Sequence, residues 1–328
     1  MKLIVMIQHQ FELWEAPGWF DQRLREDFPG LQIVRFSTRD GREQELDDAE
    51  IIFTWALKPE QFARDPRLQW IHCPAAAVHQ LMFPELVNSN AILTNGRNVH
   101  GPVVAEHVLA LIFALAKNLP YAMRLQARRV WGPELMWAEN ARPREVSGAT
   151  LGLVGIGSIG REVAKSAAAL GMNVIATRQD PNKPMPESVR EVFATNDLSA
   201  MLAESDYVVL AVPVTASTKK MIDAERLAAM RPNACLINVG RGSVLDEVAL
   251  EHALRTKKIA AAALDVFEQE PLPEDSPLWE MENALITPHT AGLTEKLWER
   301  QYAFFSENLR RFMNGQPLLA VVNKQKGY

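Results

Sequence analysis

Three glycines near the middle of the chain have a spacing that suits the binding of a nucleotide's phosphates. Gly155, Gly157 and Gly160 form a G-x-G-x-x-G pattern. In such a turn the first glycine allows a sharp bend, the second lets the backbone approach a pyrophosphate, and the third lets the helix pack closely on the strand. The phosphates would lie at the positive end of the helix dipole, where Ser158 and Ile159 fall in the first turn.

The elements predicted around this pattern are those that such a turn needs. The apolar run 151–156 predicts a strand, and the small residues that follow, up to Leu170, predict a helix that stops at Gly171. A second apolar run, 173–177, ends at Arg178. Strand, turn, helix and strand together form a dinucleotide-binding βαβ unit. The alternative is a glycine-rich turn in another kind of α/β domain.

Polar residues stand at the ends of later apolar runs. The further predicted strands are 207–212, 234–239, 260–266 and 285–287. Arg241, Asp265 and His289 fall at or just beyond the ends of the last three. Because ligands bind beyond the carboxyl ends of the strands in open parallel sheets, these three side chains are candidates to face a ligand.

The first hundred residues predict a separate α/β domain without a glycine fingerprint. Its predicted strands are 2–7, 32–36, 51–55, 69–73 and 91–94. Strands that alternate with helices indicate a parallel sheet. The fold we expect is therefore α/β, with two Rossmann-like domains built on doubly wound parallel sheets. A substrate domain of residues 1–98 plus 291–328 would receive the dinucleotide-binding domain, residues 99–290, as an insertion, with a cleft between the two.

Two stretches near the start of the inserted domain predict contact surfaces. Residues 99–119 are so apolar that we expect one long helix, buried on most sides at a domain or subunit boundary. Residues 121–144 are rich in Arg, Met and Trp, including Trp131 and Trp137. Such residues favour interfaces, so we expect an arm or loop that packs on a second subunit of a homodimer. An ordinary surface loop is the alternative.

Composition excludes several classes of function. A net charge of −5 provides no overall basic field for nucleic acid. No apolar run approaches the length of a membrane span. Cys73 and Cys235 lie in apolar runs without metal or redox spacing, so we expect reduced core residues, a cytoplasmic protein and no metal site.

Four segments resemble the D-isomer-specific 2-hydroxyacid dehydrogenases, including their glyoxylate and hydroxypyruvate reductases. The segments are ATLGLVGIGSIG, INVGRGSVLDEVAL, AAALDVFEQEPLP and TPHTAG, in the family's order. The resemblance implies a catalytic triad of Arg241, Glu270 and His289. Reduction of a 2-keto acid adds hydride to the carbonyl carbon and a proton to its oxygen. His289 would donate the proton, Glu270 would orient the ring and favour its charged form, and Arg241 would bind the carboxylate and carbonyl oxygens.

The resemblance also implies a substrate loop. It reads Ala76-Ala77-Val78-His79, where alanine replaces the family's glycine and histidine its acid, and its N–H groups would hold the substrate carboxylate together with Arg241. Trp55, Leu57, Met82 and Trp137 are candidates to line the substrate pocket. Arg97, His100 and His107 match no catalytic position, and we expect structural roles for them.

The same resemblance implies a set of cofactor-binding residues beyond the glycine turn. They are Thr177, Arg178, Val212, Pro213, Thr218, Val239, Gly240, Arg241, Asp265, His289, Ala291 and Gly292. Among them, Asp265 matches the position that contacts the nicotinamide carboxamide.

The end of the second strand predicts which nicotinamide cofactor is preferred. An NAD site has Asp or Glu there to accept from the ribose 2′-hydroxyl. This chain has Thr177 and Arg178, and its next acid, Asp180, comes two positions later. A guanidinium would pair with a 2′-phosphate, so we expect NADP(H) to be preferred over NAD(H).

The predicted function is the NADPH-dependent reduction of a 2-keto acid, such as glyoxylate, hydroxypyruvate or a related aliphatic keto acid, to the D-2-hydroxy acid. Two alternatives stay open at this stage. One is an NAD-preferring dehydrogenase of another 2-hydroxy acid. The other is a corepressor-like protein that senses nicotinamide nucleotides.

Overall fold

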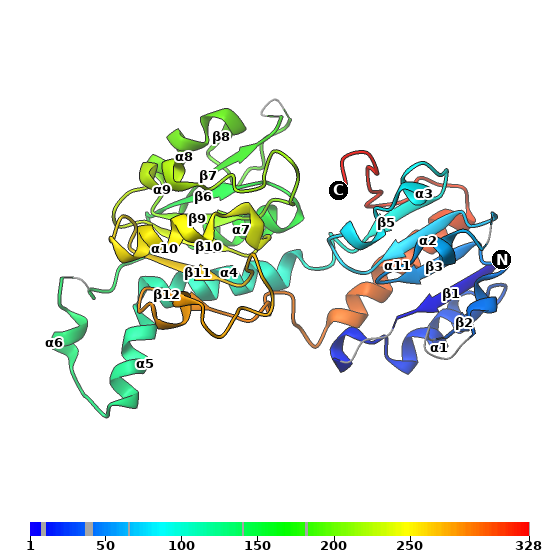
Figure 1. Cartoon of the computed structure of the whole chain (residues 1–328), viewed down its shortest axis with the longest axis horizontal. Coiled ribbons are helices and arrows are strands. Elements are labelled where there is room, and N and C mark those ends of the chain that lie inside the picture. Colours follow the sequence, from blue (N-terminus) through cyan, green and yellow to red (C-terminus); the bar gives the residue numbers. More distant parts are fainter. Residues whose placement is uncertain (8–10, 37–41, 65, 140, 181–182, 328) are drawn as a thin grey trace. The chain divides into compact units, whose positions relative to one another are not determined.

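The computed structural model describes the whole chain except residues 8–10, 37–41, 65, 140, 181–182 and 328 (Figure 1). The described chain divides into two compact units. Unit 1 comprises Met1–His100 and Leu293–Tyr328, and unit 2 comprises Gly101–Gly292. Unit 2 is thus an insertion in the sequence of unit 1.

Unit 1 contains a five-stranded parallel sheet. Its strands are β1 (Lys2–Met6), β2 (Gln32–Arg35), β3 (Ile51–Thr54), β4 (Trp70–Cys73) and β5 (Ile92–Asn95), in the order β2-β1-β3-β4-β5. Its helices are α1 (Gly18–Asp27), α2 (Pro59–Phe62), α3 (Pro84–Val87) and α11 (Leu297–Met313), with short 3-10 turns at Glu12–Trp14, Glu43–Leu46 and His79–Leu81.

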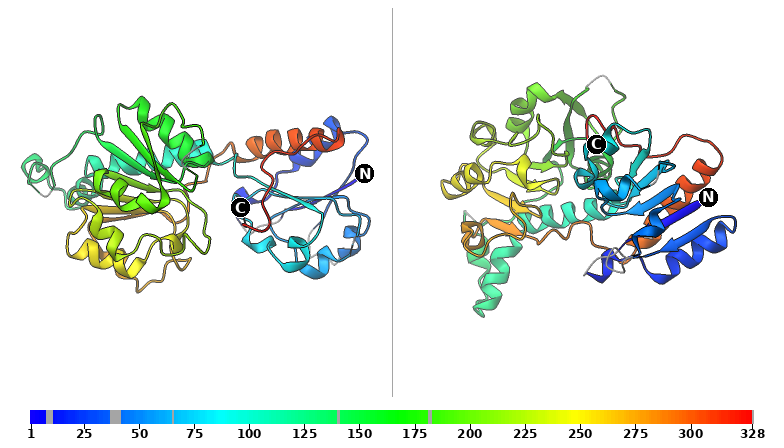
Figure 2. Two further views of the ribbon diagram at one scale, coloured as in Figure 1. Left: turned by 90° about the horizontal axis from the view of Figure 1, so that it is seen from above. Right: turned by 45° about the vertical axis from the view of Figure 1, so that its right-hand side comes forward.

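Alternation along the strands explains why helices cover both faces of this sheet. Leu3 and Val5 pack with Phe305 of α11 on one face, whereas Ile4 and Ile52 belong to a separate apolar cluster on the other. Figure 2 shows α1 and α11 on one side of the sheet and α2 and α3 on the opposite side. Neighbouring residues of a strand point to opposite faces, so two-sided burial requires the near-continuous apolar runs seen in the sequence.

Unit 2 contains a seven-stranded parallel sheet. Its strands are β6 (Thr150–Val154), β7 (Asn173–Arg178), β8 (Glu191–Ala194), β9 (Tyr207–Leu210), β10 (Cys235–Asn238), β11 (Ala261–Leu264) and β12 (Ala284–Ile286). The order is β12-β11-β10-β9-β6-β7-β8, so the direction of winding reverses between β6 and β9. In doubly wound folds this reversal marks the ligand-binding edge.

Helices cover both faces of the second sheet as well. In unit 2 the helices are α4 (Gly101–Ala116), α5 (Leu119–Ala127), α6 (Pro133–Met136), α7 (Ser158–Ala169), α8 (Leu198–Glu204), α9 (Ala224–Ala229) and α10 (Glu247–Arg255), with 3-10 turns at Thr195–Asp197, Gly242–Val244 and Pro277–Glu280. Residues of α4 and α7 share one apolar cluster, and residues of α8, α9 and α10 share the other. The predicted α/β fold with two doubly wound parallel sheets is therefore confirmed.

Two details of the prediction are wrong. The helix expected over 99–119 ends at Ala116, because Asn118 has a left-handed φ of 49° and a new helix, α5, starts at Leu119. The stretch 121–144, predicted as an arm or loop, contains most of α5 and all of α6. Strand β8 was not predicted, since it is a four-residue edge strand with only partly buried residues.

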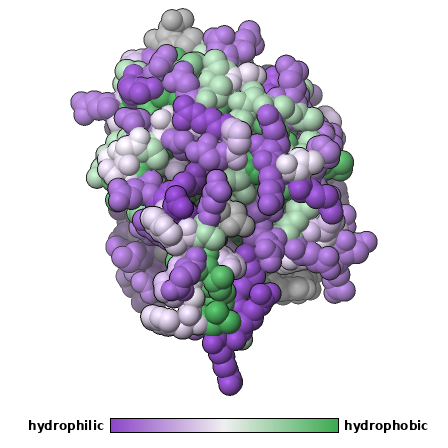
Figure 3. Space-filling view, turned by 90° about the vertical axis from the view of Figure 1, so that its left-hand side faces the viewer, coloured by the Kyte–Doolittle hydropathy of each residue, from purple (hydrophilic) through white to green (hydrophobic). Residues whose placement is uncertain are grey.

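Helices α5 and α6 extend away from the sheet of unit 2 (Figure 1). On the face seen from that side, hydrophobic and hydrophilic residues are mixed (Figure 3). Among the described residues, no single helix is long and apolar enough to cross a membrane. Only α4 and α5 taken together pass that criterion, and they are bent by 66°.

Candidate active site

The glycine turn between β6 and α7 has the geometry of a phosphate cradle. Gly155 has a φ of 102°, and a Cβ there would lie 2.6 Å from Cγ1 of Val212. A Cβ on Gly160 would lie 2.2 Å from the carbonyl oxygen of Gly155, so this approach requires glycine. A Cβ on Gly157, by contrast, would have no protein atom within 4 Å. Its side of the turn is open, at the N-terminus of α7, where Ser158 and Ile159 form the first turn.

The ends of the neighbouring strands lie next to this turn. A Cβ on Gly240, after β10, would lie 3.1 Å from the carbonyl oxygen of Val212, after β9. Thr218 donates its hydroxyl proton to the carbonyl of Pro213 at 2.6 Å and accepts from the N–H of Thr215 at 2.7 Å. The fold thus brings together Gly155, Val212 and Gly240, three of the predicted cofactor-binding residues.

The side chains of Thr177 and Arg178 at the end of β7 are held by the protein itself. Thr177 is 2% exposed. Arg178 donates from Nη1 to the carbonyl oxygen of Pro184 at 3.2 Å and from Nη2 to that of Lys183. The guanidinium is therefore oriented by the backbone of the loop that follows β7.

His289 and Glu270 form a close pair. His289 Nδ1 lies 2.6 Å from Glu270 Oε2, while the second oxygen, Oε1, accepts from the N–H of Phe267 at 3.0 Å. Because the carboxylate accepts, the proton of the ring lies on Nδ1, and Nε2 is the nitrogen left for a substrate. His289 has a φ of 53°, an uncommon conformation for a residue with a side chain.

Arg241 is held against the segment that carries Glu270. A Cβ on Gly242 would lie 1.8 Å from the carbonyl carbon of Phe267, so the two backbones are in direct contact. Arg241 Nη1 donates to the carbonyl of Gly240 at 2.6 Å. Burial lowers the pKa of Arg241, and the charge of Glu270 partly opposes this shift. A guanidinium is among the most basic groups in proteins, so Arg241 stays positively charged at neutral pH.

Asp265 is 1% exposed, and its carboxylate binds the loop that carries His289. Oδ1 accepts from the N–H of Thr290 at 2.8 Å and from the hydroxyl of Thr287 at 2.6 Å, and Oδ2 accepts from the N–H of Ala291 at 3.0 Å. The family resemblance implied a nicotinamide contact for Asp265, but nothing in the sequence indicated a role for Thr287.

Three amide side chains donate to backbone carbonyls in or near the predicted substrate loop of unit 1. Asn95 donates to the carbonyl of Ala76 at 2.6 Å, Gln301 to that of Pro74 at 2.7 Å, and Gln80 to that of Trp55 at 2.8 Å. Sequence reasoning missed all three. Gln301 carried a signal, because it is a polar residue on the core-facing stripe of α11 and is fully buried.

The departures from the family in this loop have small structural effects. Ala77 is not among the described residues with a positive φ, so alanine is accommodated without backbone strain. Val78 is buried and His79 is exposed. Leu57, a candidate for the pocket lining, is 3% exposed and belongs to an apolar cluster of unit 1.

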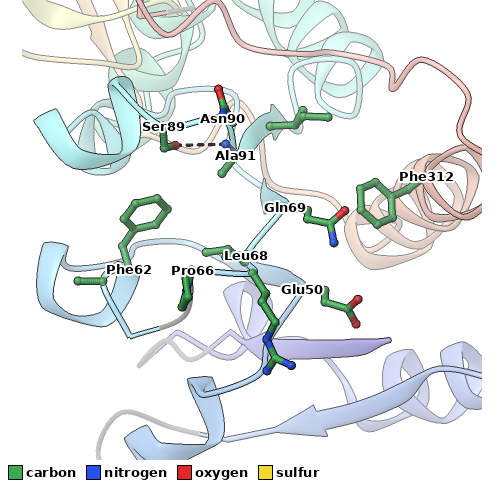
Figure 4. A pocket seen from close by; sticks show the side chains of 12 residues that line it. Glu50, Phe62, Pro66, Leu68, Gln69, Ser89, Asn90, Ala91 and Phe312 are labelled. Atoms are coloured by element: carbon green, nitrogen blue, oxygen red, sulfur yellow. Dashed lines mark hydrogen bonds between the residues drawn. The ribbon is translucent and has the colours of Figure 1, made fainter.

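A hollow of about 690 Å³ in unit 1 lies away from this loop (Figure 4). Its lining includes Gln69 and Ala91, which precede β4 and β5, together with Phe62 and Phe312. The loop Ala76–Val78 follows the opposite, carboxyl end of β4. None of the predicted site residues lines the hollow.

The parallel sheet, its glycine turn and the pair of His289 and Glu270 define a dinucleotide-binding oxidoreductase domain. A family model described as D-isomer specific 2-hydroxyacid dehydrogenase, NAD binding domain, matches residues 109–291. The chain belongs to the D-isomer specific 2-hydroxyacid dehydrogenase family.

Relatives across the whole chain agree with this assignment. A glyoxylate reductase from Pyrococcus furiosus is 30% identical over 328 residues, which cover 98% of this chain and 92% of the relative. A D-3-phosphoglycerate dehydrogenase from Methanocaldococcus jannaschii is 30% identical over 304 residues, or 92% of this chain, but the match spans only 57% of that relative's length.

A solved structure has the same fold. It is a D-isomer specific 2-hydroxyacid dehydrogenase from Xanthobacter autotrophicus Py2 in complex with NADPH and MES. It is 31% identical, with a TM-score of 0.85, and the match covers 100% of this chain and 99% of that one.

Proposed function

We propose that the protein reduces a small 2-keto acid, glyoxylate or hydroxypyruvate, to the corresponding 2-hydroxy acid with NADPH, and that a chiral product is the D isomer. The observation that carries this proposal is the bond of 2.6 Å between His289 and Glu270, on a strand end of a dinucleotide-binding sheet. The name of the Pyrococcus furiosus relative, glyoxylate reductase, supports the substrate class.

The chemistry divides among three side chains. A nicotinamide cofactor, held by the turn of Gly155, Gly157 and Gly160, would supply hydride to the carbonyl carbon of the substrate. His289 gives a proton from Nε2 to the carbonyl oxygen, and the carboxylate of Glu270 stabilises the positive ring through Nδ1. Arg241 binds the carboxylate and the developing oxyanion, because its planar guanidinium offers paired donors and keeps its charge.

We further propose that the backbone N–H groups of Ala77 and Val78 hold the substrate carboxylate. The amide side chains that fasten this loop support the idea, because a hydrogen-bond donor aids binding only if its own backbone is fixed. Asn95 does so by donating to the carbonyl oxygen of Ala76.

The cofactor preference is proposed from the end of β7. Arg178 stands where an NAD site has an acid, and an acid would repel a 2′-phosphate. NADPH in the Xanthobacter autotrophicus relative supports the same choice. The Arg178 guanidinium donates to the carbonyls of Lys183 and Pro184, which orients it at the end of β7.

A panel of 2-keto acids assayed with NADPH and with NADH tests the proposal. We expect oxidation of NADPH with glyoxylate or hydroxypyruvate, at a higher kcat/KM than with NADH. Binding of NADPH without turnover of any keto acid would contradict an enzyme and favour a nucleotide-sensing protein. Turnover with NADH preferred would contradict only the cofactor assignment.

We also propose a cytoplasmic homodimer that pairs through α5 and α6. Trp131 is 96% exposed, Met123 67% and Trp137 65%, and a hollow of about 530 Å³ is lined by neighbouring residues of this region. Large exposed apolar side chains of this kind favour an interface. Both cysteines are free and buried, which agrees with a reducing compartment. Light scattering should give twice the mass of one chain, and the double change Trp131→Glu with Met123→Glu should give a monomer.

A further inference from the structure

His107 is joined to the loop of His289 by a short chain of hydrogen bonds. Its Nε2 lies 3.1 Å from Thr287 Oγ1 and 3.6 Å from Asp265 Oδ1. The side chain is 20% exposed and comes from α4, 180 residues earlier in the sequence than Thr287. His107 is therefore linked to the loop of His289 indirectly, through Thr287 and Asp265.

The direction of these bonds follows from the number of protons available. The hydroxyl of Thr287 has one proton, and it lies 2.6 Å from Oδ1 of Asp265, which already accepts the N–H of Thr290. A carboxylate can only accept, so Thr287 donates to Asp265. Thr287 Oγ1 can then only accept from His107, and Nε2 of His107 must carry a proton.

This series of hydrogen bonds ends at the backbone around His289. Asp265 accepts from Thr290 and Ala291, the two residues that follow His289, and its own carbonyl accepts from the N–H of His289 at 2.9 Å. These bonds hold His289 at a φ of 53°. A strained residue of this kind stays in place only while its surroundings fix it, so the orientation of Asp265 matters to the ring of His289.

We propose that His107 is a positioning residue for His289. By donating from Nε2 to Thr287 it fixes the hydroxyl and the Asp265 carboxylate, and through them the backbone that presents the His289 ring. The proposal rests on the proposed function, in which His289 donates the proton. Packing alone does not call for a histidine here, because the buried residues of α4 are apolar or glycine.

Three variants separate a donor from a mere space-filling group. In His107→Gln the amide nitrogen takes the place of Nε2 and can still donate, whereas His107→Asn places its amide nitrogen near Nδ1 and cannot reach Thr287. His107→Leu removes the donor and keeps apolar bulk. We expect kcat to fall about tenfold in the Leu and Asn variants and to stay within threefold in the Gln variant, with KM for the keto acid changed by less than twofold in all three.

Hydrogen exchange of the protein without cofactor gives a readout that does not depend on turnover. The amides of Thr290 and Ala291 should exchange at least fivefold faster in His107→Leu than in wild type, and at the wild-type rate in His107→Gln. Thermal melting confirms that each variant is folded.

The outcomes distinguish the two proposals. Folded Leu and Asn variants with wild-type kcat and exchange rates would overturn the role of His107, and so would a Gln variant as impaired as Leu. A wild-type protein without turnover would contradict the proposed function. In that case the exchange rates alone still decide whether His107 orders the His289 loop.

Discussion

Nδ1 of His289 lies 2.6 Å from Oε2 of Glu270, and the other oxygen of Glu270 accepts the N–H of Phe267. The carboxylate is thus fixed at both oxygens, one by the backbone and one by the ring. A ring oriented in this way keeps a proton on Nδ1 and leaves Nε2 as the nitrogen that can face a substrate.

Replacing His289 by alanine should remove the general acid. We expect kcat to fall about a thousandfold, since a positioned acid contributes roughly 10²–10⁴ to a rate. The Kd for NADPH, measured by fluorescence, should change little. Full activity in His289→Ala would show that another group donates the proton.

Glu270→Gln tests the charge of the pair rather than its geometry. The amide oxygen can still accept from Nδ1, but the negative charge that favours the imidazolium is gone. We expect kcat to fall about tenfold or more, because no negative charge then stabilises the imidazolium that donates the proton. Steady-state kinetics with the keto acid measures this, and a kcat equal to that of wild type would mean that the charge of Glu270 plays no part.

Arg178→Asp tests the cofactor preference. An aspartate would repel the 2′-phosphate and accept from a 2′-hydroxyl, so kcat/KM for NADPH should fall at least tenfold while that for NADH holds or rises. Arg178→Gln is the matched control, because it removes the positive charge without introducing repulsion. Its kcat/KM for NADPH should lie between the values of wild type and Arg178→Asp. Equal efficiencies in wild type, or a preference unchanged by Arg178→Asp, would remove Arg178 from this role.

Two glycines of the same turn should respond to alanine in opposite ways. A methyl group at Gly157 meets no protein atom within 4 Å, so Gly157→Ala should melt like wild type but bind NADPH at least tenfold more weakly if the phosphates lie there. At Gly160 the methyl would lie 2.2 Å from the carbonyl oxygen of Gly155, and overpacking of this kind costs about 1–3 kcal/mol of stability. Melting curves and NADPH titrations of both variants check this, and unchanged affinity in Gly157→Ala would contradict the cradle.

The sequence alone was enough to predict the two sheets and the glycine turn, because these depend on local patterns. Apolar runs mark buried parallel strands, and Gly155, Gly157 and Gly160 are read from their spacing. Strand β8 was not predicted, because an edge strand needs few apolar residues. The break at Asn118 was not predicted, because a left-handed residue inside an apolar stretch leaves no periodic signal.

The supporting contacts of the candidate site were beyond prediction for a different reason. His107 and Thr287 are 180 residues apart, and Gln301 and Pro74 are 227 apart. Each pair lies within one unit, and its members meet only when the sheet of that unit and the helix packed on it have formed. A single sequence shows at most that a polar residue stands in an apolar helix face, as Gln301 and His107 do, without its partner.

His72 should make unit 1 sensitive to acid. The side chain is fully buried against Phe53 and Phe305, and its Nδ1 is hydrogen-bonded to Oγ1 of Thr94 at 2.8 Å. Burial lowers the pKa of His72 to about 3. The unfolded chain binds a proton near pH 6.5, so the contribution of neutral His72 is complete above that pH and is lost as pH falls toward 3. At pH 4.5 the loss should be roughly 2–3 kcal/mol of unfolding free energy.

Urea unfolding at pH 7 and pH 4.5, followed by tryptophan fluorescence, measures this loss, since five of the eight tryptophans belong to unit 1. His72→Phe keeps an aromatic ring without a titrating group, so its loss between the two pH values should be smaller by that amount. Equal losses in the two proteins would mean that the acid sensitivity comes from another group.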